Sequence, residues 1–210
     1  MLYKRYIKRL LDILLSGIGI IVLAIPMLII AIVIKIDSKG SVLFTQERIG
    51  IHKSRFKCLK FRSMHTETPA NMPTHLLNDP EQWITRAGRI LRRYSLDELP
   101  QIFCIFIGKM SIIGPRPALW NQNDLIAERD KYGANDVRPG LTGWAQINGR
   151  DELPIEVKAC LDGEYVKKIN FTFDIKIFFG TILNVLKHDG VVEGGTTTIE
   201  QEKSRELAEK

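Results

Sequence analysis

The stretch Ser95-Leu96-Asp97-Glu98-Leu99-Pro100-Gln101 organises this chain, and two arginines, Arg92 and Arg93, lie just before it. Ser95 and Glu98 have the spacing of a helix capping box, in which each side chain accepts a hydrogen bond from a free backbone N–H at the helix start. This predicts Asp97 at the second helical position, where exposed N–H groups and the helix dipole keep a carboxylate ionised. Such a carboxylate beside arginines is suited to attack phosphorus. The alternative is that Asp97 and Glu98 only cap a helix, because capping boxes are common.

The composition is that of a globular protein with an anionic partner. The 210 residues and 24.0 kDa allow one ordinary domain with a small appendage. Hydrophobic residues make up 45% and charged residues 26%, and the net charge of +6 gives a pI of about 9.2. This balance suits nucleic acid, an anionic membrane surface or phosphorylated substrates. The three cysteines lie far apart without metal-ligand spacing, which favours a reduced compartment facing the cytosol.

An apolar run from Ile13 to Ile34 dominates the N-terminal part of the chain. About 22 residues at ~1.5 Å each reach ~33 Å as a helix, which is enough to cross a bilayer. Basic residues flank both ends of the run, which favours the cytoplasmic side for both ends, and Pro26 interrupts it near the middle. We therefore expect a re-entrant helix that breaks at Pro26 and returns to the same face, with a plain span as the alternative. Asp12 is expected to pair with Lys8 or Arg9.

Beyond the apolar run, the pattern predicts an α+β domain that is mostly helical. We expect a small β-hairpin from strands 41–46 and 55–64, a loop over 66–81, and helices over 83–94 and 121–132. The apolar segments 101–109 and 171–187 belong either to the core or to helices at the membrane interface. The expected organisation is a membrane anchor over 1–36, a cytosolic domain over 37–190 and a flexible charged tail over 191–210.

Several basic and aromatic residues are candidates for binding anions. Arg116 lies between two prolines that fix its backbone, and its planar fork suits a phosphate, although the same segment also reads as a rigid turn. Lys60 and Arg62 lie on the second expected strand, where a solvated face beside a membrane is the alternative. The glycine-containing loop 138–150 allows close approach of a ligand and carries two arginines and Trp144. It has neither the GxxxxGK[ST] nor the GxGxxG pattern.

The ordered set of these segments resembles the small, single-anchor bacterial polyprenol-phosphate phosphoglycosyl transferases. The matching pieces span nearly the whole chain: the anchor with its proline, 56–64 (FKCLKFRSM), 95–99 (SLDEL), 114–117 (GPRP) and 138–150 (RPGLTGWAQINGR). The chain departs from the family pattern at Ile25-Pro26, where a serine commonly precedes the proline. A second departure is Lys109, where an acid often stands, so no metal ligand is placed at Lys109.

The resemblance implies transfer of a sugar-1-phosphate from a UDP-sugar to undecaprenyl phosphate, with release of UMP, at the cytoplasmic face of the bacterial inner membrane. It implies that Asp97 is the nucleophile of an aspartyl-phosphosugar intermediate, with Mg²⁺ held by Asp97 and Glu98. The residues that it assigns to substrate binding are Arg92, Arg116, Arg138, Arg150, Lys60, Arg62, Trp144 and Gln146. The partners implied are membrane phospholipid and, as an open possibility, a second copy of the chain; no nucleic acid is expected.

Two rival readings fit part of the sequence. A membrane-anchored binding module without chemistry accounts for the anchor and the charge of +6, but not for the adjacent Asp97 and Glu98. A transferase with many spans is excluded by the presence of a single long apolar stretch. Release of UMP from a UDP-sugar, with covalent labelling that depends on Asp97, separates the transferase from the binding module.

Overall fold

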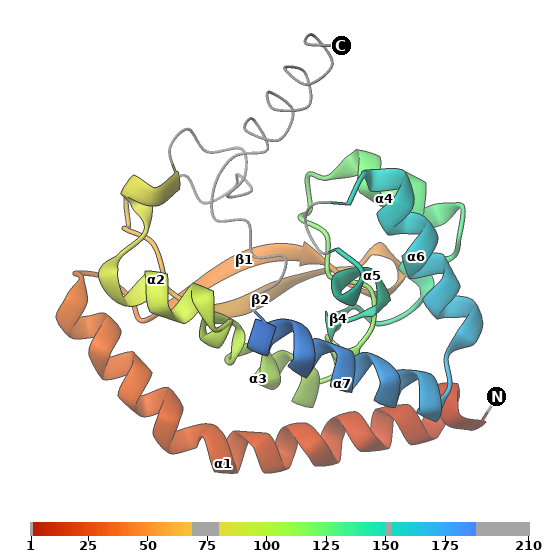
Figure 1. Cartoon of the computed structure of the whole chain (residues 1–210), viewed down its shortest axis with the longest axis horizontal. Helices are drawn as coiled ribbons and strands as arrows, with labels where there is room; N and C mark the ends of the chain where they lie inside the picture. The colour runs from red at the N-terminus through yellow and green to blue at the C-terminus, as the bar shows by residue number, and fades with distance from the viewer. Residues whose placement is uncertain (1, 69–79, 150–152, 188–210) are drawn as a thin grey trace, which may run out of the picture.

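The structure is a computed structural model and describes residues 2–68, 80–149 and 153–187. It confirms an α+β chain with one long apolar N-terminal helix and a small antiparallel hairpin (Figure 1). Most of the expected loop over 66–81, the expected tail over 191–210 and Arg150 lie outside the described residues.

Short strands are interspersed among the helices along the chain. Those that carry the argument are α1 (Lys8–Asp37), β1 (Leu43–Ile49), β2 (Arg55–Phe61), α2 (Arg86–Arg93), α3 (Gln101–Phe106), β3 (Ser111–Ile113), α4 (Asn123–Asp130), β4 (Gly140–Thr142), α5 (Trp144–Ile147), α6 (Ile155–Lys168) and α7 (Phe171–Lys187). A π-helical turn, Tyr3–Ile7, leads into α1, and 3-10 turns occupy Ile51–Lys53, Pro80–Trp83, Leu96–Glu98 and Ala134–Asp136.

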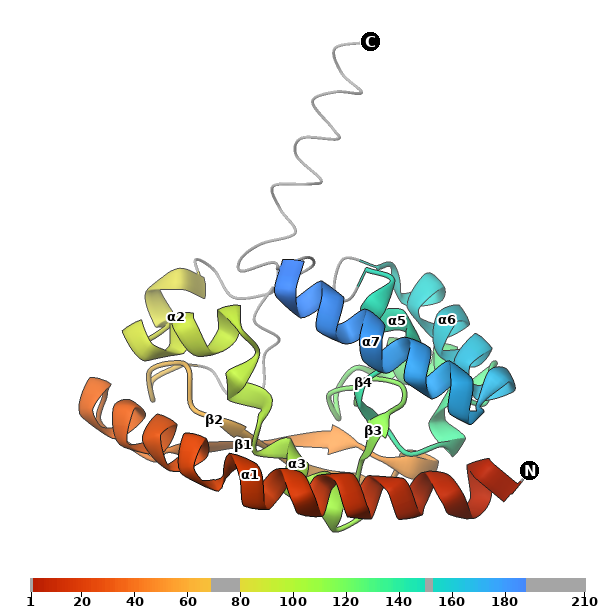
Figure 2. The same cartoon turned by 60° about the horizontal axis from the view of Figure 1, so that its bottom comes forward.

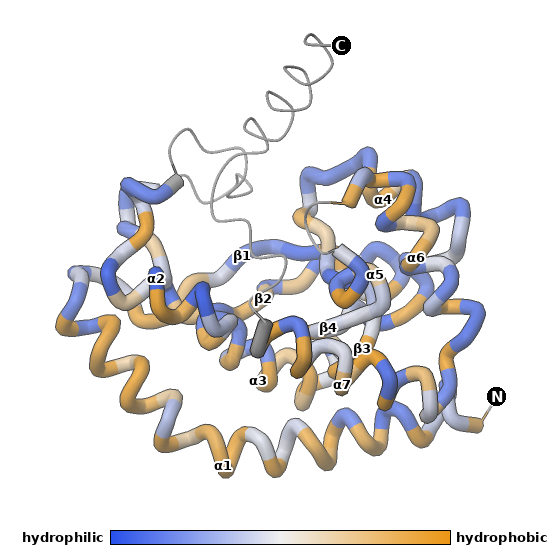
Figure 3. The backbone as a smooth tube through the Cα atoms, in the orientation of Figure 1, coloured by the Kyte–Doolittle hydropathy of each residue, from blue (hydrophilic) through white to orange (hydrophobic). Residues whose placement is uncertain are grey.

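Helix α1 runs along one whole side of the molecule and both of its ends contact the same globular body (Figures 1 and 2). At the N-terminal end, Lys8 forms an ion pair with Asp174 of α7 at 2.6 Å. At the C-terminal end, Asp37 accepts a hydrogen bond from the backbone N–H of Ala87 in α2 at 3.0 Å. The helix is continuous through Pro26 and bends along its length, so the break expected at Pro26 is not seen as an interruption. Figure 3 shows that apolar residues dominate α1 beyond its basic first turns.

The pairing expected for Asp12 is wrong. Its carboxylate Oδ1 accepts hydrogen bonds from the Ser111 hydroxyl at 3.1 Å and from the backbone N–H of Ile112 at 2.9 Å. The nearby Arg9 instead donates to the backbone carbonyls of Ile105 and Phe106. Asp12 therefore fastens the start of α1 to β3, because a buried carboxylate needs hydrogen-bond donors and β3 presents them.

The β1–β2 hairpin is antiparallel, with Leu43 opposite Phe61 and Ile49 opposite Arg55. Strand β1 begins and ends later than expected, because the reversal is made by the 3-10 turn after Gly50 rather than by residues 48–50. On β2 the side chains of Phe56 and Cys58 are buried, and the period-two alternation places the Lys60 side chain on the same face.

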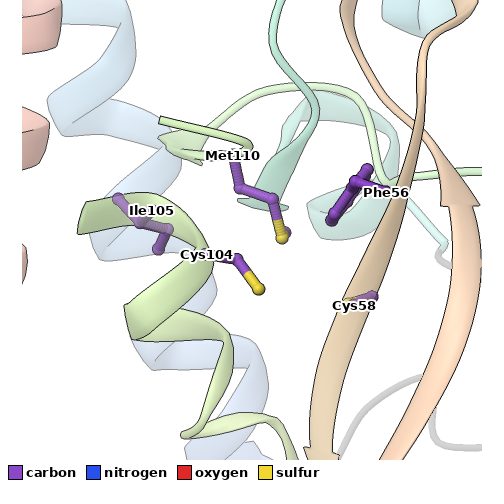
Figure 4. Packing of buried hydrophobic residues seen from close by; sticks show 5 residues of the cluster. All are labelled: Phe56, Cys58, Cys104, Ile105 and Met110. Atoms are coloured by element: carbon purple, nitrogen blue, oxygen red, sulfur yellow. The ribbon is translucent and has the colours of Figure 1, made fainter. Parts of the chain in front are cut away.

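A buried cluster pins β2 to α3. Figure 4 shows Cys104 and Ile105 on the helix opposite Phe56 and Cys58 on the strand, with Met110 beside them. All five side chains are at most 7% exposed. Because α3 directly follows the turn at Leu96–Glu98, this packing holds that turn beside the end of β2.

Strands β3 and β4 pair in parallel, and glycines allow the close approach around them. A Cβ atom on Gly140 would lie 2.1 Å from the backbone N of Gly114, and one on Gly143 would lie 2.1 Å from the Gly114 carbonyl oxygen. The expectation that these glycines admit a ligand is therefore corrected for Gly140 and Gly143, because the close neighbour is the chain's own backbone.

Helices α3 and α7 each have a buried face and an exposed apolar face. Each segment therefore belongs to the core on one side and presents an apolar surface on the other, which combines the two predicted alternatives of a core segment and an interfacial helix. In α7, Ile177 is fully buried, whereas Phe171, Phe178 and Phe179 are 42–58% exposed. In α3, Cys104 and Ile105 are buried while Phe103 and Phe106 are exposed.

Candidate active site

The turn that carries Asp97 differs from the predicted helix start. Ser95 has φ 54° and makes no capping hydrogen bond, and residues Leu96–Glu98 form a 3-10 turn. The capping-box prediction is therefore wrong: Ser95 adopts a left-handed conformation and its side chain does not cap the turn that follows. A non-glycine residue in this conformation costs about 1 kcal/mol or more, and such strain is concentrated at functional sites.

The turn brings Glu98 between two cations that come from distant parts of the chain. Lys60 at the end of β2 donates from Nζ to Glu98 Oε1 at 2.8 Å. Arg116, which follows β3, donates from Nη2 to Oε1 at 2.8 Å and from Nη1 to Oε2 at 3.4 Å. The Glu98 side chain is 12% exposed. Glu98 is thus held from both sides by ion pairs that are largely removed from water.

Asp97 lies in the same cluster but is far less engaged. It is 8% exposed, and its Oδ2 lies 3.9 Å from Lys60 Nζ, beyond hydrogen-bond distance. Within the described part of the chain, its carboxylate accepts no hydrogen bond. An Asp97 carboxylate without a fixed partner is free to approach another electrophilic or cationic centre.

The environments of the two carboxylates push their pKa values in opposite directions. Burial, the largest influence, raises the pKa of Asp97; the Glu98 charge adds to this, while Lys60, Arg92 and Arg116 oppose it. Burial would also raise the pKa of Glu98, but Arg116 and Lys60 outweigh it and hold that pKa well below its ordinary value. The expectation that N–H groups and a helix dipole stabilise the Asp97 anion is wrong, because burial dominates. Divergent pKa values of adjacent acids are typical of sites where they have different roles.

The donor set fits a magnesium ion. Mg²⁺ is commonly bound by one or two carboxylates together with water and substrate phosphates. Asp97 offers oxygens that are not already hydrogen-bonded, whereas Glu98 would have to share its oxygens with Lys60 and Arg116. Asp97 is accordingly the better ligand of the two. Among the described residues no cluster of three or more His, Cys, Asp or Glu side chains forms, so phosphate oxygens would have to complete the shell.

Of the predicted substrate-binding residues, the structure brings Lys60, Arg92 and Arg116 to the two carboxylates. Arg92 lies in the last turn of α2 and acts on Asp97 through its charge. Three cations from three separate elements thus surround a pair of acids, which leaves the cluster suited to an anionic ligand.

Of the other predicted residues, the structure describes Arg62, Arg138, Trp144 and Gln146, and it does not bring these to the cluster. The Arg62 guanidinium donates to the backbone carbonyls of Ser38 and Lys39 and is 5% exposed, so it fastens the loop between α1 and β1. The Trp144 ring contacts the Phe173 ring with centroids 5.0 Å apart, and the Lys176 ammonium lies 5.2 Å from its centroid. Trp144 is therefore part of the packing of α5 against α7 and lies partly buried there.

Gln146 and Arg138 also have local structural partners. Gln146 is 7% exposed and donates to the Leu141 carbonyl at 3.2 Å. Arg138 donates from Nε to the Gly108 carbonyl at 3.1 Å, next to Arg9, and lines a different cavity.

A buried ion pair that sequence reasoning missed supports Arg116. Arg129 of α4 contacts Asp162 of α6 at 2.6 Å, with side chains 4% and 1% exposed. Its Nη1 donates to the Arg116 backbone carbonyl at 2.9 Å. The sequence predicted a helix over 121–132, but the charged Arg129 gave no sign of burial. The only local indication that Arg129 is buried was its spacing from Leu125, which places both residues on one face of the helix.

Comparison with known proteins places the chain in a family. The model of the bacterial sugar transferase family matches residues 3–188. The chain is 37% identical over 207 residues to the UDP-galactose-lipid carrier transferase of Erwinia amylovora, covering 89% of this chain and 42% of the relative. It is 40% identical over 185 residues to the undecaprenyl-phosphate glucose phosphotransferase of Komagataeibacter xylinus, covering 83% of this chain and 35% of the relative.

A shorter relative matches along most of its length. The exopolysaccharide production protein ExoY of Sinorhizobium fredii is 33% identical over 189 residues, covering 83% of each chain. By contrast, this chain spans about two fifths of the first relative and about one third of the second. The match over residues 3–188 takes in α1, the Asp97–Glu98 turn and α7 together, and the chain belongs to the bacterial sugar transferase family.

Proposed function

We propose that this chain transfers a sugar-1-phosphate from a UDP-sugar to undecaprenyl phosphate, releasing UMP, in the assembly of a bacterial glycoconjugate. The names of the relatives, which include a UDP-galactose-lipid carrier transferase and an undecaprenyl-phosphate glucose phosphotransferase, support the substrate classes. The observation that carries the proposal is the cluster itself: a buried Asp97 with only a long ion pair to Lys60, beside a Glu98 held closely by Lys60 and Arg116.

The proposed reaction has two steps at one phosphorus atom. Asp97 attacks the phosphorus that bears the sugar; the bond from that phosphorus to the bridging oxygen breaks, and UMP leaves with the bonding electrons. The aspartyl phosphosugar is then attacked by an oxygen of the lipid phosphate, which releases the Asp97 carboxylate and forms undecaprenyl-diphosphate-sugar. Two steps allow two anionic substrates to use one cluster of cations in sequence.

The residues around Asp97 divide the work by their contacts. Glu98 fixes Lys60 and Arg116, so that both cations face the site without rearrangement when the diphosphate arrives. Arg92 adds positive charge from the end of α2. A bound Mg²⁺ would neutralise the diphosphate and the departing UMP.

The raised pKa of Asp97 has a consequence for this chemistry. A carboxylate that is costly to ionise is a stronger base and a better nucleophile than an ordinary aspartate once it has lost its proton. We expect the labelling rate to fall as the pH is lowered through the Asp97 pKa, above the range of an ordinary aspartate.

The proposal is tested with a UDP-sugar labelled in the sugar and without any lipid acceptor. We expect about one equivalent of UMP and a protein-bound label, both abolished in Asp97→Asn. The matched control is Asp130→Asn, because Asp130 lies on the exposed surface with Lys53 at 3.0 Å. Labelling of Asp97→Asn at the wild-type rate would falsify the covalent step, and binding without UMP release by the wild type would favour the module without chemistry.

We also propose that α1 is re-entrant and places the domain on the cytoplasmic face of the membrane. A helix of 30 residues is about 45 Å long, yet both of its ends contact one globular body. In a plain span the two ends lie on opposite faces, so one set of contacts would be lost. The helix Tyr3–Asp37 contains a stretch that is long and apolar enough to enter a membrane, which supports insertion.

The topology is tested with single cysteines at the two ends of α1. The background is Cys160→Ser, because Cys160 is exposed, whereas Cys58 and Cys104 are buried and burial raises the pKa of the Cys58 thiol to about 11. We expect Lys4→Cys and Lys39→Cys to react with a membrane-impermeant thiol reagent only when the cytoplasmic side is open. Labelling from opposite sides refutes the re-entrant proposal without affecting the chemistry.

A further inference from the structure

A second cationic site lies at the N-terminal end of α1. A cavity of about 100 Å³ is lined by Lys4, Lys8, Arg9 and Asp12 of the first helical turns, by Ser111 and Tyr165, and by the segment Asp136–Arg138. None of the described residues of the Asp97–Glu98 cluster lines it. The transferase proposal therefore does not use this cavity.

Two guanidinium groups meet at the end of α3. Arg9 donates from Nη1 to the Ile105 carbonyl at 2.7 Å and from Nη2 to the Phe106 carbonyl at 2.8 Å. Arg138 donates only from Nε, to the Gly108 carbonyl at 3.1 Å. Within residues 2–68, 80–149 and 153–187, the terminal nitrogens of Arg138 and the ammonium of Lys4 have no hydrogen bond or ion pair. Like charges held side by side lower their energy by sharing an anion.

The acids that line the cavity are already engaged. Asp12 accepts hydrogen bonds from Ser111 and Ile112, and Asp136 lies 3.2 Å from His52 on the surface. Lys8 is neutralised by Asp174 at 2.6 Å. Hydrogen bonds from neutral donors leave the charge of Asp12 in place. The four cations Lys4, Lys8, Arg9 and Arg138 still outnumber the acids Asp12, Asp136 and Asp174, so the cavity keeps an excess of positive charge.

The surroundings of the cavity are apolar on the side of α1. Directly after the basic turns, Leu10 and Leu14 are 56% and 52% exposed, and Phe171 of α7 is 54% exposed beside Tyr3. Basic side chains at the edge of an apolar helix lie at the depth of lipid headgroups. A ligand with both a phosphate and a hydrocarbon tail matches both parts of this surface.

We propose that Lys4, Arg9 and Arg138 bind the phosphate group of a membrane lipid, at a site separate from the Asp97–Glu98 cluster. The fork of Arg138 suits a bidentate contact with phosphate, and Lys4 adds a point charge. A phospholipid and a polyprenyl phosphate share this chemistry, and the binding arms below distinguish them.

The test uses the full chain in a neutral detergent with no nucleotide sugar present, so its result is independent of the proposed function. Four probes are titrated: dihexanoyl phosphatidic acid, farnesyl phosphate, dihexanoyl phosphatidylcholine and inorganic phosphate. Native mass spectrometry counts the bound probe. We expect saturable binding of one phosphatidic acid or farnesyl phosphate, and the tighter of the two identifies the source. Inorganic phosphate that binds as tightly as both would overturn the lipid assignment.

The variants separate this site from general surface charge. Lys4→Gln and Arg138→Gln are each expected to weaken binding about fivefold, the contribution of one basic residue at a membrane surface. Arg5→Gln is the matched control: Arg5 is the exposed neighbour of Lys4, stacks on Tyr6 and does not line the cavity. Arg138→Lys should retain part of the affinity, which guards against misfolding of the glutamine variant. Equal losses in Lys4→Gln, Arg138→Gln and Arg5→Gln, or loss of binding in Asp97→Asn, would overturn the proposal.

Discussion

The adjacent acids Asp97 and Glu98 should change the stability of the protein in opposite directions when each is neutralised. Glu98→Gln keeps the size of the side chain but leaves Lys60 and Arg116 facing an uncharged amide. Breaking a buried ion pair costs about 3–5 kcal/mol. The Lys60 and Arg116 side chains are 19% and 31% exposed, and this access to water reduces the cost to about 2–3 kcal/mol.

Asp97→Asn removes a carboxylate whose burial is only partly compensated. Because burial raises the Asp97 pKa, the ionised form opposes folding at neutral pH. We expect this variant to gain about 0.5–1 kcal/mol while losing all covalent labelling. At about 2–4 °C per kcal/mol for a domain of this size, Tm should fall by about 4–12 °C in Glu98→Gln and rise by about 1–4 °C in Asp97→Asn.

The assay is thermal unfolding in a neutral detergent, followed by tryptophan fluorescence at one scan rate. Glu164→Gln is the control, because Glu164 pairs with Lys168 on the surface and should change stability by less than about 0.5 kcal/mol. The pH dependence of stability provides a second check on whether each carboxylate stabilises or destabilises the fold. The Glu98 contribution is present above its ordinary pKa and is lost as the pH falls through its lowered folded value. The Asp97 penalty appears as the pH rises above about 3.9 and is complete above its raised folded pKa.

The reasoning fails if Glu98→Gln has the same Tm as the control Glu164→Gln, since the ion pairs of Glu98 would then contribute nothing to stability. It fails equally if Asp97→Asn is destabilised as much as Glu98→Gln. In that case the two carboxylates would have equivalent environments, and the division between a nucleophile and a fixed partner would lose its physical basis.

Substitutions at three further positions test the framework around the site. Gly88→Ala should destabilise the protein by about 2 kcal/mol or more in thermal unfolding, because a Cβ would lie 1.9 Å from the Ser63 carbonyl oxygen; an unchanged Tm contradicts the close packing of α2. Ser95→Gly should raise stability by roughly 0.5–1 kcal/mol, because glycine adopts φ 54° without strain, and Ser95→Val should lower it; the reverse order refutes the strained turn. Arg129→Lys keeps the charge but loses the contact with the Arg116 carbonyl, so KM for the UDP-sugar should rise about tenfold with a smaller change in kcat; an effect on kcat alone contradicts the positioning role.

The elements that could be predicted from the sequence are those determined by local pattern. The hairpin followed from two runs of strand-forming residues, and the apolar run gave α1 directly. The inward position of Lys60 could also be predicted from the sequence, because Lys60 lies two residues beyond Cys58 and so shares the buried face of β2. Its charge pointed to a solvated face, and only the acid that it meets, Glu98, explains its position.

The features that could not be predicted depend on contacts between distant segments. The capping box failed because Ser95 adopts a left-handed conformation, which the packing of α2 and α3 on either side imposes. Arg116 and Arg138 were both predicted to bind substrate, yet they lie in different sites. Arg116 reaches Glu98, whereas Arg138 joins Arg9 at the end of α3. Nothing in their local sequences encodes that division.

The attachment of α1 connects the membrane to both halves of the candidate site. At one end, Asp12 holds Ser111 and Ile112 of β3, and the chain then runs directly to Arg116. At the other end, Asp37 holds the first turn of α2, which leads to the turn carrying Asp97. A helix fixed at the depth of the headgroups would thus fix the cation and the carboxylate relative to the same surface. Under the proposed function, a lipid phosphate and a soluble nucleotide sugar meet at the Asp97 carboxylate, which therefore has to stay at a constant height above the membrane. Two attachments on one re-entrant helix would provide that constraint, whereas a single tether would leave the domain free to tilt.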